Sequence, residues 1–130
     1  MKYLVDTDIC SYALKGHAPT VLRWRPLPPA ATCISVVTEA ELRFGAKGRS
    51  TVYRRELERF LDALDIVPFS STETATYADL RYQLARAGTP IGVLDLVIAA
   101  QALANDFVLV TNNEREFRRV PGLKIENWVA

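Results

Sequence analysis

Acidic side chains stand beside short apolar runs, where oxygen ligands could gather at one site. Asp6-Thr7-Asp8 follows the apolar run 3–5, and Asp95 lies inside the apolar segment 93–100. A buried carboxylate without a partner is costly, so the fold has to supply Asp95 with a cation, hydrogen-bond donors or a cleft. The structural alternatives are that Asp6 caps a helix and that Asp95 interacts with the free amides of a first helical turn.

Two further acidic residues are candidates for the same site. Glu41 lies early in a predicted helix that follows the apolar run 32–34, and Glu116 lies just after the polar cluster 111–113. Glu39 stands two positions before Glu41, and residues two apart point in different directions on a helix, so at most one of them faces a given cleft. Asparagine is common in turns, so 111–113 also has a purely structural interpretation.

The candidate residues indicate metal-assisted phosphoryl chemistry. The chain has one histidine and two cysteines, which excludes a four-thiolate zinc site and disfavours a Ser-His-Asp triad. Carboxylate oxygens suit hard cations, Mg²⁺ or Mn²⁺. Such an ion polarises a phosphate and lowers the pKa of a bound water, so metal-activated water is the expected nucleophile.

A basic stretch supplies a counterpart for phosphate groups. Residues 43–59 contain six basic and two acidic side chains, a net charge of 6 − 2 = +4, together with Phe44 and Tyr53, whose rings can stack on nucleobases. The alternative is a solvated helix face on which these charges pair three or four residues apart. The whole chain has 16 basic and 15 acidic residues, net +1, which argues against binding nucleic acid through bulk charge alone.

The elements that position these residues belong to a predicted single α/β domain over residues 1–130. Apolar runs predict short strands at 2–5, 32–34, 66–69, 107–110 and 124–126, and periodic segments predict helices at 9–14, 35–45, 52–64, 71–87 and 93–104. Strands alternating with helices indicate a parallel sheet with helices on both faces. Ligands bind such sheets beyond the carboxyl ends of the strands.

The hydropathy pattern favours a cytoplasmic protein with no contact to a membrane. The N-terminal sequence Met-Lys-Tyr-Leu-Val-Asp reaches a charge after three apolar residues, which is too short for a signal-peptide core. No apolar stretch approaches the roughly 20 residues of a membrane span.

Taken in order, these motifs resemble VapC-type toxins of the PIN-domain ribonuclease family. The matching pieces span nearly the whole chain and are Leu4–Cys10, Ile34–Thr38 with Glu41-Leu42 and Gly45, Pro90–Gly92 with Asp95 and Ile98–Ala100, Leu109–Asn113 with Glu116-Phe117, and the tail 120–128. Their order and spacing together are highly specific. The resemblance implies a small parallel sheet flanked by helices in one domain.

The resemblance also implies roles for individual residues. Asp6 and Asp95 become the principal metal ligands, and Glu41 becomes the third acidic residue, which orients the water. PIN domains often place Asp where this chain has Asn113. Glu116 matches the acidic residue before Phe in the VapC pattern and is expected to serve at the fourth acidic position, directly or through water.

The leading hypothesis is the toxin of a type II toxin–antitoxin system that hydrolyses RNA phosphodiester bonds with Mg²⁺, or Mn²⁺, leaving a 5′-phosphate and a 3′-hydroxyl. The resemblance further implies a homodimer and a VapB-type antitoxin, which covers the acidic cleft and binds operator DNA. One alternative is a non-catalytic PIN-fold protein that binds an antitoxin or RNA. Another is a haloacid-dehalogenase-like phosphatase with Asp6 as covalent nucleophile.

Overall fold

Five short parallel strands form one sheet in a computed structural model, which describes residues 2–130. The strands are β1 (Tyr3–Val5), β2 (Thr32–Ser35), β3 (Asp65–Val67), β4 (Val108–Val110) and β5 (Ile125–Glu126), and their order across the sheet is β3-β2-β1-β4-β5. In the register, Leu4 of β1 lies opposite Cys33 on one side and Leu109 on the other. The predicted parallel α/β sheet is confirmed.

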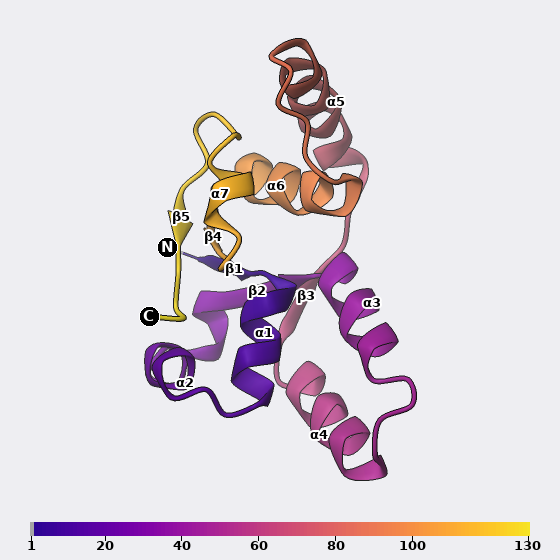
Figure 1. The fold of residues 1–130 in the computed structure, drawn as a ribbon, viewed down its shortest axis with the longest axis vertical. Helices are drawn as coiled ribbons and strands as arrows, with labels where there is room; N and C mark the ends of the chain where they lie inside the picture. The colour runs from indigo at the N-terminus through magenta and orange to yellow at the C-terminus, as the bar shows by residue number, and fades with distance from the viewer. Residues whose placement is uncertain (1) are drawn as a thin grey trace.

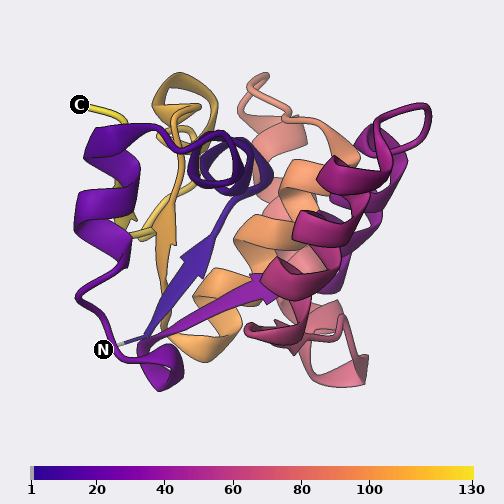
Figure 2. The same ribbon diagram turned by 90° about the horizontal axis from the view of Figure 1, so that it is seen from below.

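Helices cover both faces of the sheet (Figures 1 and 2). They are α1 (Thr7–Leu14), α2 (Ala18–Trp24), α3 (Val36–Gly45), α4 (Thr51–Asp62), α5 (Ser71–Arg86), α6 (Val93–Asn105) and α7 (Glu114–Phe117), with a 3₁₀ turn at Pro29–Ala31. Figure 1 shows α5, α6 and α7 on one side of the sheet and α1, α2 and α4 on the other. None of the helices within residues 2–130 is both long and apolar enough to span a membrane.

The predicted helices differ from the observed ones in three places. Helix α1 begins at Thr7 rather than at residue 9, because the side chain of Asp6 caps it. Helices α2 and α7 were not predicted from the sequence. Helix α2 opens with a proline near its first position and has a single buried residue, Thr20, and α7 is only one turn long, so neither has a clear apolar period.

The core consists of two layers, one on each face of the sheet. Successive side chains of a strand point to opposite faces and therefore belong to different layers. Leu4, Cys33 and Leu109 pack with α5 and α6 in one cluster, whereas their neighbours Val5, Ile34 and Val110 pack with α1, α3 and α4 in the other. A parallel sheet buried on both faces leaves its strands no room for polar side chains. Polar chemistry is therefore confined to the strand ends.

The direction of the chain across the sheet reverses at β1. The next two strands add on one side of β1, and β4 and β5 add on the other, so the carboxyl ends of β1 and β4 flank the topological switch point at which ligands bind open α/β sheets. Pairing continues past both strand ends. The Asp6 amide donates to the Val110 carbonyl at 2.9 Å, and the Thr111 amide donates to the Glu126 carbonyl at 2.9 Å.

Trp128 fastens the C-terminal segment to the face that α1 and α2 cover. Its ring makes edge contacts with Tyr3 at 5.5 Å and Trp24 at 5.8 Å between centroids. Its carbonyl accepts a hydrogen bond from the buried hydroxyl of Thr20 at 3.0 Å. Because the preceding strand β5 supplies the acceptor for the Thr111 amide, Trp128 helps to hold that strand end in place.

We expect Trp128→Ala to lower the free energy of unfolding by about 3 kcal/mol, since it removes a buried indole and leaves a cavity. Urea denaturation followed by circular dichroism measures the change. Leu22→Ala on α2 is the control, because Leu22 is largely exposed and its loss should change stability by less than about 0.5 kcal/mol. Equal stability of the two variants would contradict the packing described for the C-terminal segment.

Candidate active site

Asp6 occupies the end of β1 and caps α1 at the same time. The residue is only 6% exposed. One oxygen, Oδ1, accepts from the Thr7 amide at 2.8 Å, and the other, Oδ2, accepts from the Thr111 hydroxyl at 2.8 Å. Burial raises the pKa of Asp6 to about 7, and the charge of Asp8 adds to this shift, although the two hydrogen bonds oppose it. The capping interpretation is thus correct, and it coexists with an unusual electrostatic environment.

Asp8 ties the ends of β1 and β4 together. Its Oδ2 accepts from the Asn112 amide at 3.1 Å, and its Oδ1 accepts from the Ile9 amide at 2.8 Å. Burial also raises the pKa of Asp8. No role was predicted for this residue, although its place two positions after Asp6 was a signal that it belongs to the same strand end.

Glu41 reaches the β1 end from α3. The Thr7 hydroxyl donates to Glu41 Oε1 at 2.8 Å and lies 3.1 Å from the hydroxyl of the fully buried Thr38. Glu39 turns the other way and pairs with Arg43 at 3.0 Å. Only one of the two glutamates therefore faces the strand ends, as the helical spacing predicts.

Asp95 and Glu116 form a carboxylate pair at the start of α6. Burial raises the pKa of Asp95 to about 7, as do its hydrogen bond to Glu116 and the charges of Glu116, Asp6 and Glu41. Burial also opposes ionisation of Glu116, but hydrogen bonds from the Gly92 amide, Asp95 and Asn113 outweigh it and lower the pKa of Glu116. Of the two carboxyl groups, Asp95 is therefore the more readily protonated and Glu116 the more readily ionised.

Hydrogen bonds join this pair to Asp6. The Asn113 side chain donates to Glu116 Oε2 at 2.6 Å, and the Gly92 amide donates to Glu116 Oε1 at 3.0 Å. The Asn113 amide in turn donates to the Thr111 hydroxyl at 3.0 Å, which itself donates to Asp6. Gly92 is not acidic, so a search for carboxylates alone does not identify it.

The four predicted site residues Asp6, Glu41, Asp95 and Glu116 come from separate parts of the chain, and the charges of the other three raise the pKa of Asp95. No ion pair among residues 2–130 involves any of the four. The positive charge of Arg119 helps to lower the pKa of Glu116. An excess of negative charge on oxygen donors fits a hard divalent cation.

The arrangement is open rather than a closed metal cage. Within the described part of the chain, no three side chains of His, Cys, Asp or Glu converge as a ready-made metal cluster. Mg²⁺ is typically held by one or two carboxylates and keeps several waters, with the remaining contacts made by substrate phosphates. The donor set is therefore compatible with Mg²⁺ and incompatible with a structural zinc site.

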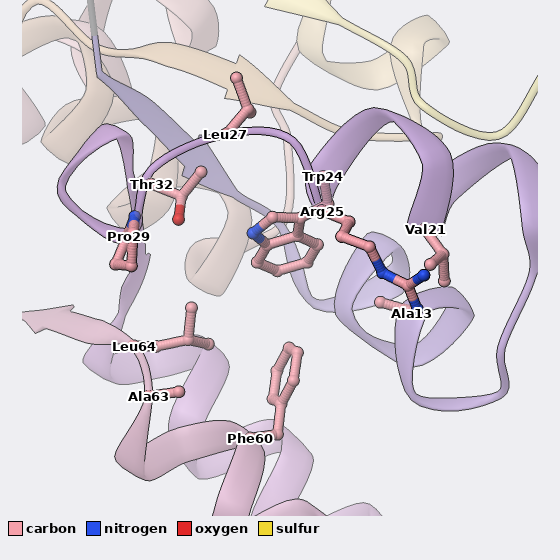
Figure 3. Close-up of a pocket in the computed structure, with 10 residues that line it drawn as sticks. All are labelled: Ala13, Val21, Trp24, Arg25, Leu27, Pro29, Thr32, Phe60, Ala63 and Leu64. Carbon is pink, nitrogen blue, oxygen red and sulfur yellow. The ribbon is translucent and has the colours of Figure 1, made fainter.

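A hollow of about 290 Å³ lies away from these carboxylates, between α2, the following loop and α4 (Figure 3). Trp24, Leu27, Phe60 and Leu64 line it together with Arg25, and no carboxylate does. Its rings are packed edge to face, with Trp24 and Phe60 5.5 Å apart. This hollow lacks the groups for phosphoryl chemistry, which leaves the strand-end carboxylates as the candidate reaction site.

Comparison with known proteins agrees with this geometry. The PIN domain family matches residues 3–123. The chain is 36% identical to a tRNA(fMet)-specific endonuclease VapC of Shigella flexneri and 37% identical to Ribonuclease VapC2 of Rickettsia felis, in each case with 98% of both chains covered. PIN-domain ribonucleases generally depend on divalent metal ions.

Solved structures show the same fold. The VapBC2 complex of Rickettsia felis bound to a promoter DNA fragment contains a chain that superimposes with a TM-score of 0.88 at 37% identity, covering 98% of this chain and 99% of that one. DNA-bound VapBC of Salmonella typhimurium gives a TM-score of 0.87 at 36% identity, with 98% of both chains covered. On its strand-end carboxylates, its sheet order and these similarities, this chain belongs to the PIN-domain family, among the VapC-type ribonucleases.

Proposed function

We propose that this chain is the toxin of a type II toxin–antitoxin pair and that residues 1–130 act as one PIN domain that cuts RNA. One observation carries the proposal: near the switch point the charges of Asp6, Glu41 and Glu116 all act on Asp95, and none of these four carboxylates has an ion pair within residues 2–130. The names of the relatives, a tRNA(fMet)-specific endonuclease and a ribonuclease, support RNA as the substrate.

Each carboxylate receives a role that follows from its contacts. The resemblance to PIN domains makes Asp6 and Asp95 the proposed metal ligands. Burial and neighbouring negative charge raise the pKa of both, and a bound cation would offset this repulsion by stabilising the ionised carboxylates. A divalent ion held there, Mg²⁺ or alternatively Mn²⁺, polarises the phosphate and offsets the charge that develops in the transition state. Glu116 supports the site by holding the Gly92 amide at the start of α6.

Glu41 is the proposed acceptor for the attacking water. The Thr7 hydroxyl holds Glu41 Oε1, which orients the carboxylate and leaves Oε2 for a hydrogen bond from water. The water oxygen forms a bond to phosphorus as the bond from phosphorus to the 3′-oxygen breaks in line with it. The 3′-oxygen takes up a proton, so the products are a 3′-hydroxyl and a 5′-phosphate.

The two alternative functions have less support. A covalent phosphatase needs a free nucleophilic oxygen on Asp6, yet both oxygens accept hydrogen bonds and the side chain is buried. A decayed, non-catalytic site would be expected to lose its hydrogen-bonding order. Asn113 instead donates to Glu116 and to Thr111, so the residue that replaces an acid still organises the carboxylates.

A VapB-type antitoxin is the proposed partner, in keeping with the VapBC complexes among the structural relatives. The excess of carboxylates favours an antitoxin tail with basic or apolar side chains over an acidic one. We propose that the toxin is a homodimer in the cytoplasm and that the toxin–antitoxin hetero-oligomer reaches operator DNA only through the antitoxin.

Replacing the proposed metal ligands should abolish cleavage. We expect Asp6→Asn and Asp95→Asn each to reduce RNA cleavage by at least about 100-fold, and excess EDTA to stop the wild type until Mg²⁺ is restored. Gel electrophoresis of an end-labelled RNA measures the rate, and sequencing of the ends identifies the 5′-phosphate. Full activity in either variant, or in EDTA, would contradict the mechanism.

The two glutamates of α3 provide a matched pair. Glu41→Gln should slow cleavage by about 100-fold, because an amide accepts no proton from water. Glu39→Gln changes the same atoms on the same helix but affects only the Arg43 pair at the surface, so its rate should equal that of the wild type. Equal rates for the two variants would remove Glu41 from the mechanism.

The raised pKa of Asp6 predicts a pH-dependent stability in EDTA. The unfolded carboxyl group ionises near pH 4, whereas the folded one retains its proton to about pH 7, so ionisation of Asp6 destabilises the fold increasingly as the pH rises between these values. Asp6→Asn should be more stable than the wild type by about 2 kcal/mol at pH 8, below the full linkage value because neighbouring carboxylates share the repulsion.

Urea denaturation at pH 4 and pH 8 measures this difference, which should nearly disappear at pH 4 because the folded carboxyl is protonated there and the unfolded one is about half protonated. Adding Mg²⁺ at pH 8 should stabilise the wild type and not the variant, since only the wild type keeps the ligand. Asp62→Asn, at the exposed end of α4, serves as control. A gain in stability that is equal at both pH values would show that Asp6 is not under electrostatic strain.

Co-expression tests the proposed partner. The product of a short reading frame adjacent to that of this chain should bind the toxin and prevent RNA cleavage in the cell. Removing the C-terminal segment of that product should restore cleavage while leaving its binding to operator DNA intact, measured by gel shift. Inhibition that persists without the segment would contradict an antitoxin tail in the carboxylate cleft.

A further inference from the structure

An exposed aromatic ring lies on α3 beside the candidate reaction site. Phe44 is 80% exposed, although burial of a phenyl ring is strongly favoured. It follows Glu41 by three residues, so both side chains lie on the same side of the helix. The ring therefore sits on the approach to the carboxylates rather than on a remote surface.

Phe44 forms one wall of an apolar groove of about 360 Å³ between α3 and α6. Val37, Ala40 and Phe44 line it from α3, Leu94 lines it from α6, and Glu41 borders it. Leu94 is about half exposed and directly precedes Asp95. Both walls of the groove thus continue into carboxylates of the proposed reaction site.

The structure divides the basic stretch 43–59 into paired and unpaired charges. Arg43 is held by Glu39 and Glu58, and Arg59 pairs with Glu56. Within residues 2–130, Lys47 and Arg54 have no ion pair, and they line a hollow of about 190 Å³ between α3 and α4. Arg43, which directly precedes Phe44, lines the same hollow, so the hollow begins near the end of α3 that carries Phe44.

The two aromatic rings of the stretch also differ. The guanidinium group of Arg49 lies 4.0 Å from the centroid of the Tyr53 ring and covers it. Phe44 has no such partner among the described residues. Of the two rings, Phe44 is the one with a face free for stacking.

We propose that the groove between α3 and α6 binds an unpaired nucleobase of the RNA substrate, which stacks on Phe44, and that Lys47 and Arg54 bind phosphates on one side of it. This inference rests on the proposed function and adds the position of the substrate. The apolar groove lies between the proposed reaction site, which would hold one phosphate, and Lys47 and Arg54, which would hold others. This order matches the alternation of phosphates and bases along a single strand. A base within a duplex has both faces stacked and does not fit.

Other occupants agree less well with the same features. A second copy of this chain would bury the apolar groove, but burying that groove would not engage Lys47 and Arg54, which line the separate hollow between α3 and α4. An apolar antitoxin segment would fill the groove and leave the adjacent cations unused. RNA engages the carboxylates, the ring and the cations together, which is why it is the occupant that we propose.

Binding of a short fluorescein-labelled oligouridylate tests the inference, in an Asp6→Asn background so that no cleavage occurs. Stacking on an aromatic ring contributes about 1–3 kcal/mol per base, so Phe44→Ala should raise the Kd about 5- to 150-fold. Phe44→Trp should preserve the affinity. Tyr82→Ala is the control, because Tyr82 is also an exposed aromatic ring, at 63% exposure, but lines neither of these hollows.

The phosphate contacts have a separate readout. Lys47→Ala and Arg54→Ala should each make the slope of log Kd against log salt shallower by about 0.7, the value for one phosphate of a single strand. Phe44→Ala should leave that slope unchanged while weakening the binding. Fluorescence anisotropy over a series of salt concentrations measures both effects.

Three results would overturn the inference. Equal affinities of Phe44→Ala and Tyr82→Ala would remove the stacking contact. A lower sedimentation mass of Phe44→Ala would assign the groove to contact between copies, and loss of antitoxin binding with RNA affinity intact would assign it to the antitoxin. If the wild type still cleaves RNA and Asp6→Asn does not, the proposed function stands even where this inference fails, whereas absence of both cleavage and oligouridylate binding would remove both.

Discussion

Repulsion among carboxylates at the ends of β1 and β4 is the constraint on which the rest of the structure depends. Asp6 is buried where the sheet order reverses. Its charge raises the pKa of Asp95, as do the charges of Glu41 and Glu116. Such a cluster destabilises the folded state unless the elements that carry it are held independently. The two apolar layers supply that support, because they fix β1, β4, α3 and α6 through residues that take no part in the chemistry.

Neutral donors rather than cations orient the carboxylates. Thr7, Thr111 and Asn113 donate to Glu41, Asp6 and Glu116, respectively. A lysine or arginine in those places would stabilise the metal-free fold more, but it would also compete with a divalent ion for the same oxygens. A hydroxyl or amide fixes the direction of an oxygen and leaves its charge uncompensated. Asn113 is consistent with this rule, since an aspartate there could not donate to Glu116 and would add to the repulsion.

Much of the site could be predicted from the sequence because its chemistry is local. Asp6 follows an apolar run and Asp95 interrupts one, which identifies strand ends and helix starts without knowledge of the contacts. The hydrogen bond from Thr111 to Asp6 joins residues 105 positions apart, and no local pattern specifies which hydroxyl faces which carboxylate. Helix α2 escaped prediction for a related reason, because it is held by contacts such as that of Trp24 with Trp128 rather than by an apolar period.

The net charge of +1 conceals an uneven distribution of charge along the chain, and the fold places basic and acidic side chains on neighbouring surfaces. Residues 1–60 carry ten basic and six acidic side chains, and residues 61–130 carry six and nine. Folding divides the charges further, since Arg43 and Arg59 are neutralised by glutamates while Lys47 and Arg54 are not. The free cations lie beyond the Phe44 groove and the carboxylates lie at its other border. A polyanion is attracted to the first and repelled by the second. A divalent ion bound at the carboxylates would remove this repulsion, so the proposed metal would also allow a strand on the α3–α4 surface to reach the proposed site of reaction.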